Sequence, residues 1–384
     1  MQAARPLARP ERDLRLDVLR GWMQVSIFVS HVVGTSLAWG IHAAWGLSDS
    51  SEMFILLSGM TLGSVFALKY ARAGGRTAQQ DLLTRAGRLH RTHLIVFFMF
   101  AAMVLTADML FHVPDAVGRF GWKFLAEQPL AAIAAGVTGL YQPDFMGTLP
   151  VFAFGMLLLG PFLLLVRRVG AWALVPSLAL YAAANLGWVA TPALGGTLIA
   201  FDPLAWQFLY LLGGLLGWRA LHGQRIPRSV PVAWLAGLVL VLGFAARLVQ
   251  HGFIEGPQLA ITVFEHKDVL APARLLHALS LAYLVAILVP RRAGWMEGMA
   301  GRAMAVIGRN SLRVFCAGLF LAWMISRVME AMPMASPVLG IVLVLPGIAA
   351  LWTVAVFVER GVERGAERAA QRGRQVARAR SAGL

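Results

Sequence analysis

The chain is poor in residues that build covalent cross-links or metal centres. Its 384 residues include one cysteine, Cys316, and the nine histidines show no ligand spacing and no H-E-x-x-H pattern. A single cysteine excludes an intramolecular disulfide and makes a cysteine-based metal site implausible, and a lone cysteine in an apolar run is ordinarily packing. We therefore expect no metal site and no tightly bound cofactor.

Charge is scarce and one-sided. Charged residues make up 14% of the chain, and 34 Lys and Arg outweigh 19 Asp and Glu, for a net charge of +15. The arginines lie in alternate loops and in the tail, and no basic soluble domain is present. This pattern is typical of membrane topology and speaks against nucleic acid binding.

Hydrophobic residues are abundant instead. They make up 58% of the chain, and the mean hydropathy is +0.68. They occur in runs of about 20, the length that crosses a bilayer. The basic N-terminal segment runs into such a stretch without a cleavage pattern, as in a retained signal anchor. We predict an all-α fold, a polytopic bundle of membrane helices.

We expect about ten transmembrane helices, each near the length that a bilayer requires. Their approximate limits are 15–37, 51–72, 92–111, 147–166, 170–189, 203–220, 231–250, 273–290, 309–329 and 337–358. The apolar run 124–140 is interrupted by Glu127, Gln128 and Pro129, so we expect it to lie at the interface or pack in a loop.

The loop charges predict the orientation. Basic residues precede the first span and recur in 69–91, 167–168, 219–228, 291–302 and 360–380, whereas the loops between these segments are poor in them. The positive-inside rule then places both termini in the cytoplasm and favours ten spans over eleven. The expected organisation is a basic segment 1–14, a transmembrane domain 15–358, and an Arg-rich tail 359–384 that forms a helix or a loose arm near anionic lipid.

The first span carries a polar stripe. Arg20 and His31 are eleven positions apart, so they share one helix face about 16 Å apart along the axis. Asp17 and Gln24 fall on the same face, and we expect both to bind the donor together with Arg20. Polar groups inside a membrane helix are costly and point to function, although they can also simply satisfy one another inside a bundle.

The orientation gives this stripe a direction, with Arg20 near the cytoplasmic end and His31 toward the periplasm. A charge at one depth and an imidazole further on suit a ligand such as acyl-coenzyme A, with His31 as general base on an incoming hydroxyl. Glu52 either orients His31 or caps the second span, and Asp49 is the better candidate for a cap.

Several stretches resemble the OpgC family, within the acyltransferase-3 superfamily of membrane acyltransferases. They are RDLRLDVLRGWMQVSIFVSH at 12–31, LSDSSEMFILLSG at 47–59, FDPLAWQFLYLLG at 201–213, ARLLHALSLA at 273–282 and IGRNSLRVFC at 307–316. The resemblance implies a bacterial inner-membrane enzyme that succinylates osmoregulated periplasmic glucans. It also implies His31 as the catalytic residue and Arg20 as a donor-binding or structural residue.

Two further groups of candidates follow from position. Arg85, Arg88, Arg91 and Arg309 are expected on the cytoplasmic side, where they either bind coenzyme A phosphates or only establish topology. On the outer side, residues for the acceptor or for the free carboxylate of a succinyl group are Asp144, Asp202, Gln207, Lys267, Arg274 and His277.

The leading hypothesis is an O-acyltransferase that moves an acyl group, succinyl by resemblance, from cytoplasmic acyl-CoA to a hydroxyl of a periplasmic glucan. Its partners are then membrane lipid, the glucan and the acyl-CoA donor. The alternative is a secondary transporter or flippase, although such folds often contain inverted repeats and the two halves of this sequence do not match. A third, purely structural subunit leaves the polar stripe unexplained.

Overall fold

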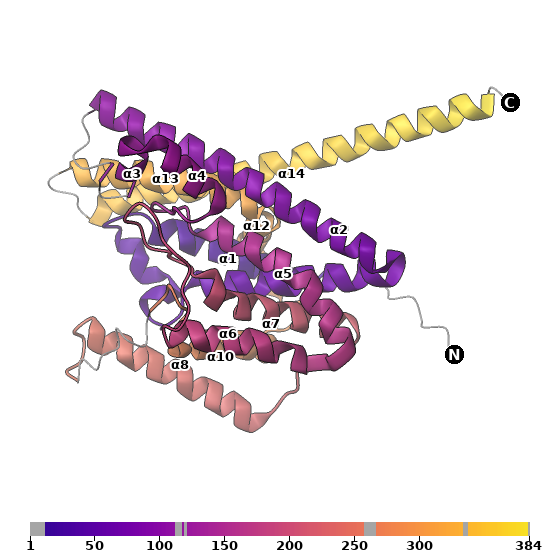
Figure 1. Cartoon of the computed structure of the whole chain (residues 1–384), viewed down its shortest axis with the longest axis horizontal. Helices are drawn as coiled ribbons and strands as arrows, with labels where there is room; N and C mark the ends of the chain where they lie inside the picture. Colours follow the sequence, from indigo (N-terminus) through magenta and orange to yellow (C-terminus); the bar gives the residue numbers. More distant parts are fainter. Residues whose placement is uncertain (1–11, 112–116, 119–120, 257–265, 333–336, 383–384) are drawn as a thin grey trace. The chain divides into compact units, whose positions relative to one another are not determined.

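A computed structural model describes residues 12–111, 117–118, 121–256, 266–332 and 337–382. The regular elements in these ranges are all helices, which confirms the all-α prediction (Figure 1). The described residues form two compact units, one within Trp45–Leu288 and one that combines Asp13–Ala44 with Val289–Leu384.

The first unit is built mainly from long apolar helices. Its elements are α2 (Ser50–Phe111), α3 (Lys123–Glu127), α4 (Pro129–Thr138), α5 (Thr148–Val169), η3 (Gly170–Ala173), α6 (Leu174–Asn185), α7 (Pro203–Leu221), α8 (Val230–Gln250) and α10 (Pro272–Leu288). Two expected spans, 51–72 and 92–111, are arms of the single helix α2. The arms meet at Gly74, whose φ of 81° and ψ of 169° interrupt the helical backbone. Glycine tolerates this conformation because it lacks Cβ.

Glycines bring α2 and α7 into backbone contact. A Cβ added at Gly59 would lie 2.1 Å from the carbonyl oxygen of Tyr210, and one at Gly63 would lie 2.1 Å from that of Gly214. Added Cβ atoms at Gly213 and Gly217 would meet the α2 backbone as closely. Each helix thus supplies a G-x-x-x-G pair, the small-residue pattern of close helix packing in membranes.

The second unit surrounds the predicted polar helix. Its elements are α1 (Leu14–Ser30), η1 (Ser36–Gly40), η2 (His42–Ala44), α11 (Gly294–Glu297), α12 (Met299–Arg309), α13 (Ser311–Ala331) and α14 (Pro337–Ala382). α12 crosses α1 at Gly21 and Gly308, where an added Cβ would lie 1.9 Å from a carbonyl oxygen of the other helix. The expected tail is helical, as the continuation of α14.

Each expected span contains a helical segment, although α1 ends at Ser30 within 15–37 and α6 covers only Leu174–Asn185 within 170–189. The run at 124–140 forms the short helices α3 and α4. Five helical stretches are long and apolar enough to cross a membrane: Ser50–Leu110, Thr148–Asn185, Val230–Gln250, Ser311–Ala331 and Val338–Gly365. The chain is therefore a helical membrane protein. The number of ten spans and the cytoplasmic location of both termini stay predictions.

Candidate functional site

His31 occupies the C-terminal end of α1. Its backbone N–H donates to the carbonyl oxygens of Ile27 and Phe28, both at 3.2 Å. Ser326 of α13 anchors this end, because its Oγ lies 3.2 Å from the carbonyl oxygen of His31 and accepts from the N–H of Val33 at 3.0 Å. The imidazole is therefore attached to a backbone that is held on both sides.

A backbone carbonyl orients the imidazole ring. His31 Nδ1 lies 2.6 Å from the carbonyl oxygen of Ile27. A carbonyl oxygen can only accept, so the hydrogen bond assigns the proton to Nδ1. In the neutral ring Nε2 then carries the lone pair that a general base uses.

A similar local geometry occurs at His222. His222 follows the last residue of α7, and its Nδ1 lies 2.8 Å from the carbonyl oxygen of Trp218, four residues back. His222 is exposed. A histidine at a helix end can thus make this contact to the carbonyl oxygen four residues back wherever it occurs. A functional role of His31 must therefore follow from the residues that surround it.

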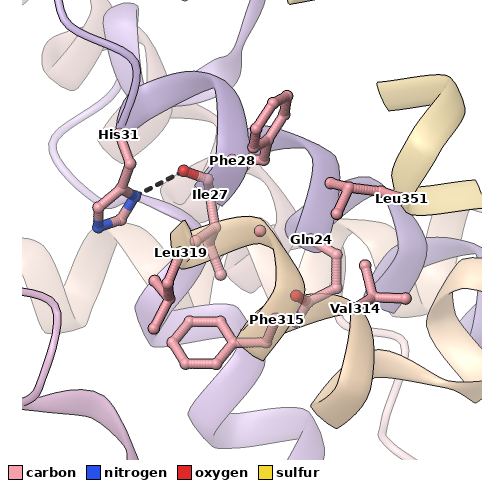
Figure 2. A pocket seen from close by; sticks show the side chains of 9 residues that line it. Gln24, Ile27, Phe28, His31, Val314, Phe315, Leu319 and Leu351 are labelled. Carbon is pink, nitrogen blue, oxygen red and sulfur yellow. Dashed lines mark hydrogen bonds between the residues drawn. The ribbon is translucent and has the colours of Figure 1, made fainter. Parts of the chain in front are cut away.

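Those surroundings are a small hollow between α1, α13 and α14 (Figure 2). Its volume is about 10 Å³, near the minimum that holds one water molecule. Its lining residues are Gln24, Ile27, Phe28, His31, Val314, Phe315, Gly318, Leu319 and Leu351. The hollow accommodates one small polar group beside apolar walls, so side chains must move before an acyl group enters.

Gln24 contributes an unused donor to this hollow. Its side chain is 2% exposed, and its Nε2 has no hydrogen-bond partner among the described residues. A buried amide without a partner is costly and therefore marks either strain or a ligand. Gln24 and His31 are seven residues apart, so both lie on the same face of α1.

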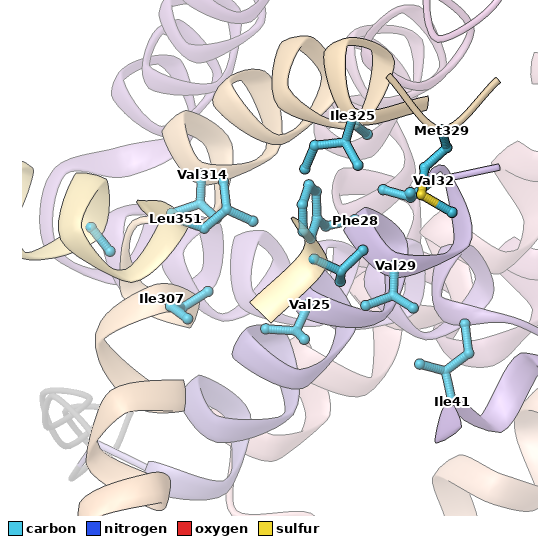
Figure 3. Packing of buried hydrophobic residues seen from close by; sticks show 13 residues of the cluster. Val25, Phe28, Val29, Val32, Ile41, Ile307, Val314, Ile325, Met329 and Leu351 are labelled. Carbon is cyan, nitrogen blue, oxygen red and sulfur yellow. The ribbon is translucent and has the colours of Figure 1, made fainter. Parts of the chain in front are cut away.

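An apolar cluster adjoins the hollow and holds α1 against α13 and α14 (Figure 3). Phe28, Val29 and Val32 pack there with Ile325 and Met329 of α13, and Val344 and Leu351 of α14 complete the cluster. Phe28, Val314 and Leu351 belong both to this cluster and to the lining of the hollow, so the packing supports the apolar wall beside Gln24 and His31.

Two of the predicted donor-binding residues, Asp17 and Arg20, lie toward the other end of α1. Asp17 is buried and Arg20 is half-buried. Arg309 ends α12, directly after the Gly308 crossing, and its Nε and Nη2 donate to the Glu359 carboxylate at 2.6 and 3.1 Å. Packing thus brings Arg309 to the α1 segment that carries Asp17 and Arg20, while an ion pair occupies its guanidinium.

The first unit contains a buried ionic cluster at the start of α2. Glu52 is fully buried, and its Oε1 accepts from Arg274 Nε at 2.7 Å. Its Oε2 accepts from the backbone N–H of Asp49 at 2.9 Å, while Asp49 Oδ1 accepts from the N–H of Ser51 at 2.7 Å. These contacts form a capping box, which confirms the capping interpretation of both acids. Since His31 belongs to the other unit, an orienting role of Glu52 toward it stays a prediction.

Lys267 and Arg274 already pair with carboxylates. Asp49 Oδ2 lies 2.7 Å from Lys267 Nζ and 3.1 Å from Arg274 Nη2. Burial alone would raise the pKa of Asp49, but the charges of Lys267 and Arg274 outweigh it and hold the pKa well below its usual value of 3.8. A succinyl carboxylate would therefore have to displace Asp49 or Glu52 from these cations.

His277 joins the same cluster through Ser48. Ser48 Oγ lies 2.7 Å from His277 Nδ1, and both side chains are buried. Ser48 is not among the predicted site residues, because nothing local marks its partner 229 residues away.

The other predicted acceptor residues are engaged within the protein or exposed. Asp202 caps α7, and its carboxylate accepts from Leu204 and from both Thr191 donors. Gln207 links α7 to α6 through two hydrogen bonds with Ser177. Asp144 is exposed in the segment before α5. Their roles toward an acceptor stay predictions.

The basic residues of α2 differ in their surroundings. Arg85 is half-buried, and its Nε donates to Asp81 at 2.8 Å. Arg88 and Arg91 are exposed. Arg85 also lines a hollow of about 450 Å³.

A family model described as OpgC protein matches residues 12–362. The chain belongs to the OpgC family. No curated protein and no solved structure matches it. Membership confirms the resemblance to OpgC and makes the chain a membrane transferase with an acyltransferase-type function in glucan modification. Its relation to the acyltransferase-3 superfamily stays a prediction.

Proposed function

We propose that this OpgC protein is an inner-membrane O-acyltransferase that moves a succinyl group from cytoplasmic succinyl-CoA to a hydroxyl of a periplasmic glucan. One observation carries the chemistry. The ring of His31 is oriented through Nδ1 by the Ile27 carbonyl oxygen and lines a hollow that also contains the unpaired Gln24 amide.

The proposed reaction balances without a further reactant. Nε2 of His31 takes the proton of the sugar hydroxyl as its oxygen attacks the thioester carbonyl carbon. The bond between that carbon and sulfur then breaks, and the departing thiolate receives the proton from the imidazolium. The Ile27 carbonyl stabilises the positive ring in between, because its dipole faces the Nδ1 proton.

Gln24 and Arg20 act on the donor in this proposal. The free Nε2 donor of Gln24 is available to an acyl or pantetheine carbonyl once the walls of the hollow move. Arg20 lies four residues before Gln24 on the same face, where it serves the anionic part of the donor. Glu52 is not required as an orienting group, because the Ile27 carbonyl already fulfils that role.

The test uses purified protein in proteoliposomes with labelled succinyl-CoA outside and glucan inside. Wild type should place label covalently on the glucan. His31→Ala should lower the transfer rate by about 10²–10⁴-fold, the usual contribution of a general base. His222→Ala is the matched control, since it removes a histidine with the same i−4 contact, and it should transfer at the wild-type rate.

Two outcomes would contradict the proposal. Full glucan succinylation by His31→Ala would remove the base from the mechanism. Uptake of intact substrate without any acylation by wild type would favour the transporter alternative.

A further inference from the structure

The interruption of α2 at Gly74 creates a cleft. Lys69 and Arg72 come from the arm before Gly74, and Thr77 and Arg85 come from the arm after it. The cleft measures about 450 Å³, and Val65, Leu68 and Ala73 complete its lining. This volume lies within the range of about 300–1,000 Å³ that small-molecule sites occupy.

Positive charge converges on this cleft. Three cations line it, and one carboxylate, Asp81, bridges two of them. Asp81 forms ion pairs with Lys69 and, at 2.8 Å, with Arg85. Arg72 is exposed, and no carboxylate among the described residues pairs with it. The lining therefore keeps an excess of two positive charges.

Membrane topology alone does not require this arrangement. The positive-inside rule needs basic residues on one side of the membrane, but it does not need them to surround one hollow. Like charges that share a cleft repel one another unless an anion neutralises them. The Asp81 bridge also holds Lys69 and Arg85 on opposite arms in place before any ligand arrives.

We propose that this cleft binds a phosphate or diphosphate group of an organic phosphate, namely the nucleotide end of the acyl-CoA donor. This step rests on the proposed function. Arg72 offers a planar fork for bidentate phosphate contact, and Lys69 adds a compact charge. Thr77 supplies a hydroxyl, and the apolar lining receives the organic part beside the phosphates.

The test measures direct binding of coenzyme A, without its acyl group, to the full chain in nanodiscs of neutral phosphatidylcholine by calorimetry. Arg72→Ala should weaken binding about tenfold to hundredfold, as expected for hydrogen bonds to a charged group. Arg72→Lys should recover part of the loss. Arg76→Ala is the matched control, because Arg76 is exposed in the same segment but does not line the cleft.

Equal affinity of Arg72→Ala, Lys69→Ala and Arg76→Ala for coenzyme A would overturn the proposal. A second set of nanodiscs contains anionic phosphatidylglycerol. If Arg72→Ala changes lipid association there but not coenzyme A binding in neutral discs, the cleft is a lipid headgroup site and the proposal is likewise overturned.

Failure of the cleft and failure of the proposed function are distinguishable. If Arg72→Ala succinylates glucan at the wild-type rate under limiting donor, the cleft assignment fails and the enzyme stands. If wild type binds coenzyme A through Arg72 but transfers no acyl group, the cleft stands and the proposed function fails. His31→Ala should bind coenzyme A like wild type, since the probe lacks the acyl group whose transfer requires His31.

Discussion

Removal of the Glu52 carboxylate should destabilise the protein strongly. Glu52 is fully buried, and Arg274, its partner, is 5% exposed. In Glu52→Ala the guanidinium keeps only Asp49, at 3.1 Å, as a carboxylate partner. Breaking a buried ion pair from one side costs about 3–5 kcal/mol, because a charge stays behind without its neutralising group. Loss of the hydrogen bond to the Asp49 N–H adds to this effect.

An exposed ion pair of the same chain calibrates the measurement. Lys123 Nζ lies 3.5 Å from Glu127 Oε1, and both side chains are exposed. Glu127→Ala should therefore lower the free energy of unfolding by less than about 1 kcal/mol. Denaturant unfolding in detergent micelles, followed by tryptophan fluorescence, gives both values under identical conditions.

The double variant Glu52→Leu with Arg274→Met separates the ion pair from general packing. It removes both charges and keeps a similar side-chain volume. Replacements of this kind are often neutral or stabilise a protein by about 1–4 kcal/mol, so the double variant should recover at least about 2 kcal/mol of the stability that Glu52→Ala loses. A loss below about 1 kcal/mol in Glu52→Ala would refute the reasoning, since it would mean that the pair is well hydrated.

A further variant, Glu52→Gln, tests whether Glu52 also orients His31. Glu52→Gln keeps the shape and an acceptor for the Asp49 N–H. If this variant retains folding but loses succinyl transfer, Glu52 acts on His31. If transfer per folded molecule is unchanged, Glu52 serves the Arg274 cluster alone.

Three further outcomes follow from packing and charge. Gly63→Ala should lower the free energy of unfolding by about 1–3 kcal/mol, because the new Cβ meets an α7 carbonyl oxygen. Gly237→Ala is the control and should not lower it, because open space surrounds that position. Equal values for the two variants would contradict the close contact between α2 and α7. The lowered pKa of Asp49 stabilises the folded state above pH 3.8, and this contribution is lost as the pH falls through the lowered value. Lys267→Met should therefore shift acid unfolding to higher pH, and an unshifted midpoint would refute the pairing. Burial raises the pKa of Tyr141 to about 12, so Tyr141→Phe should leave the ultraviolet titration below pH 11 unchanged. The same variant should lower the free energy of unfolding by about 1 kcal/mol, because it loses the hydrogen bond from the Tyr141 hydroxyl to the Gly121 carbonyl oxygen.

Local patterns were sufficient for much of the candidate site. The spacing of Arg20, Gln24 and His31 on one helix face depends only on helical geometry, and α1 has that geometry. The cap formed by Asp49 and Glu52 is likewise a pattern of four consecutive residues. Such features are predictable because their atoms are connected by a few bonds and one turn of helix.

Long-range partners were not predictable in the same way. Glu52 and Arg274 are 222 residues apart, and no periodicity or motif pairs them. The sequence also predicted 51–72 and 92–111 as separate spans, whereas one helix interrupted at Gly74 contains both. The basic cleft at this interruption was therefore not predicted. A hydropathy window reports where a segment can enter a membrane, but it does not report where a backbone bends.

Residue patterns along the chain are sufficient to predict a helical membrane protein of the OpgC family with a polar stripe on its first long helix. Hydrophobicity and helical period suffice for that, since they act residue by residue along the chain. Contacts between distant segments establish which cations Glu52 and Asp49 neutralise, and they bring Lys69, Arg72 and Arg85 to one cleft. They also leave Gln24 Nε2 without a hydrogen-bond partner among the described residues. Those properties depend on which helices the glycine contacts and the apolar cores bring together, and on the dry surroundings that result.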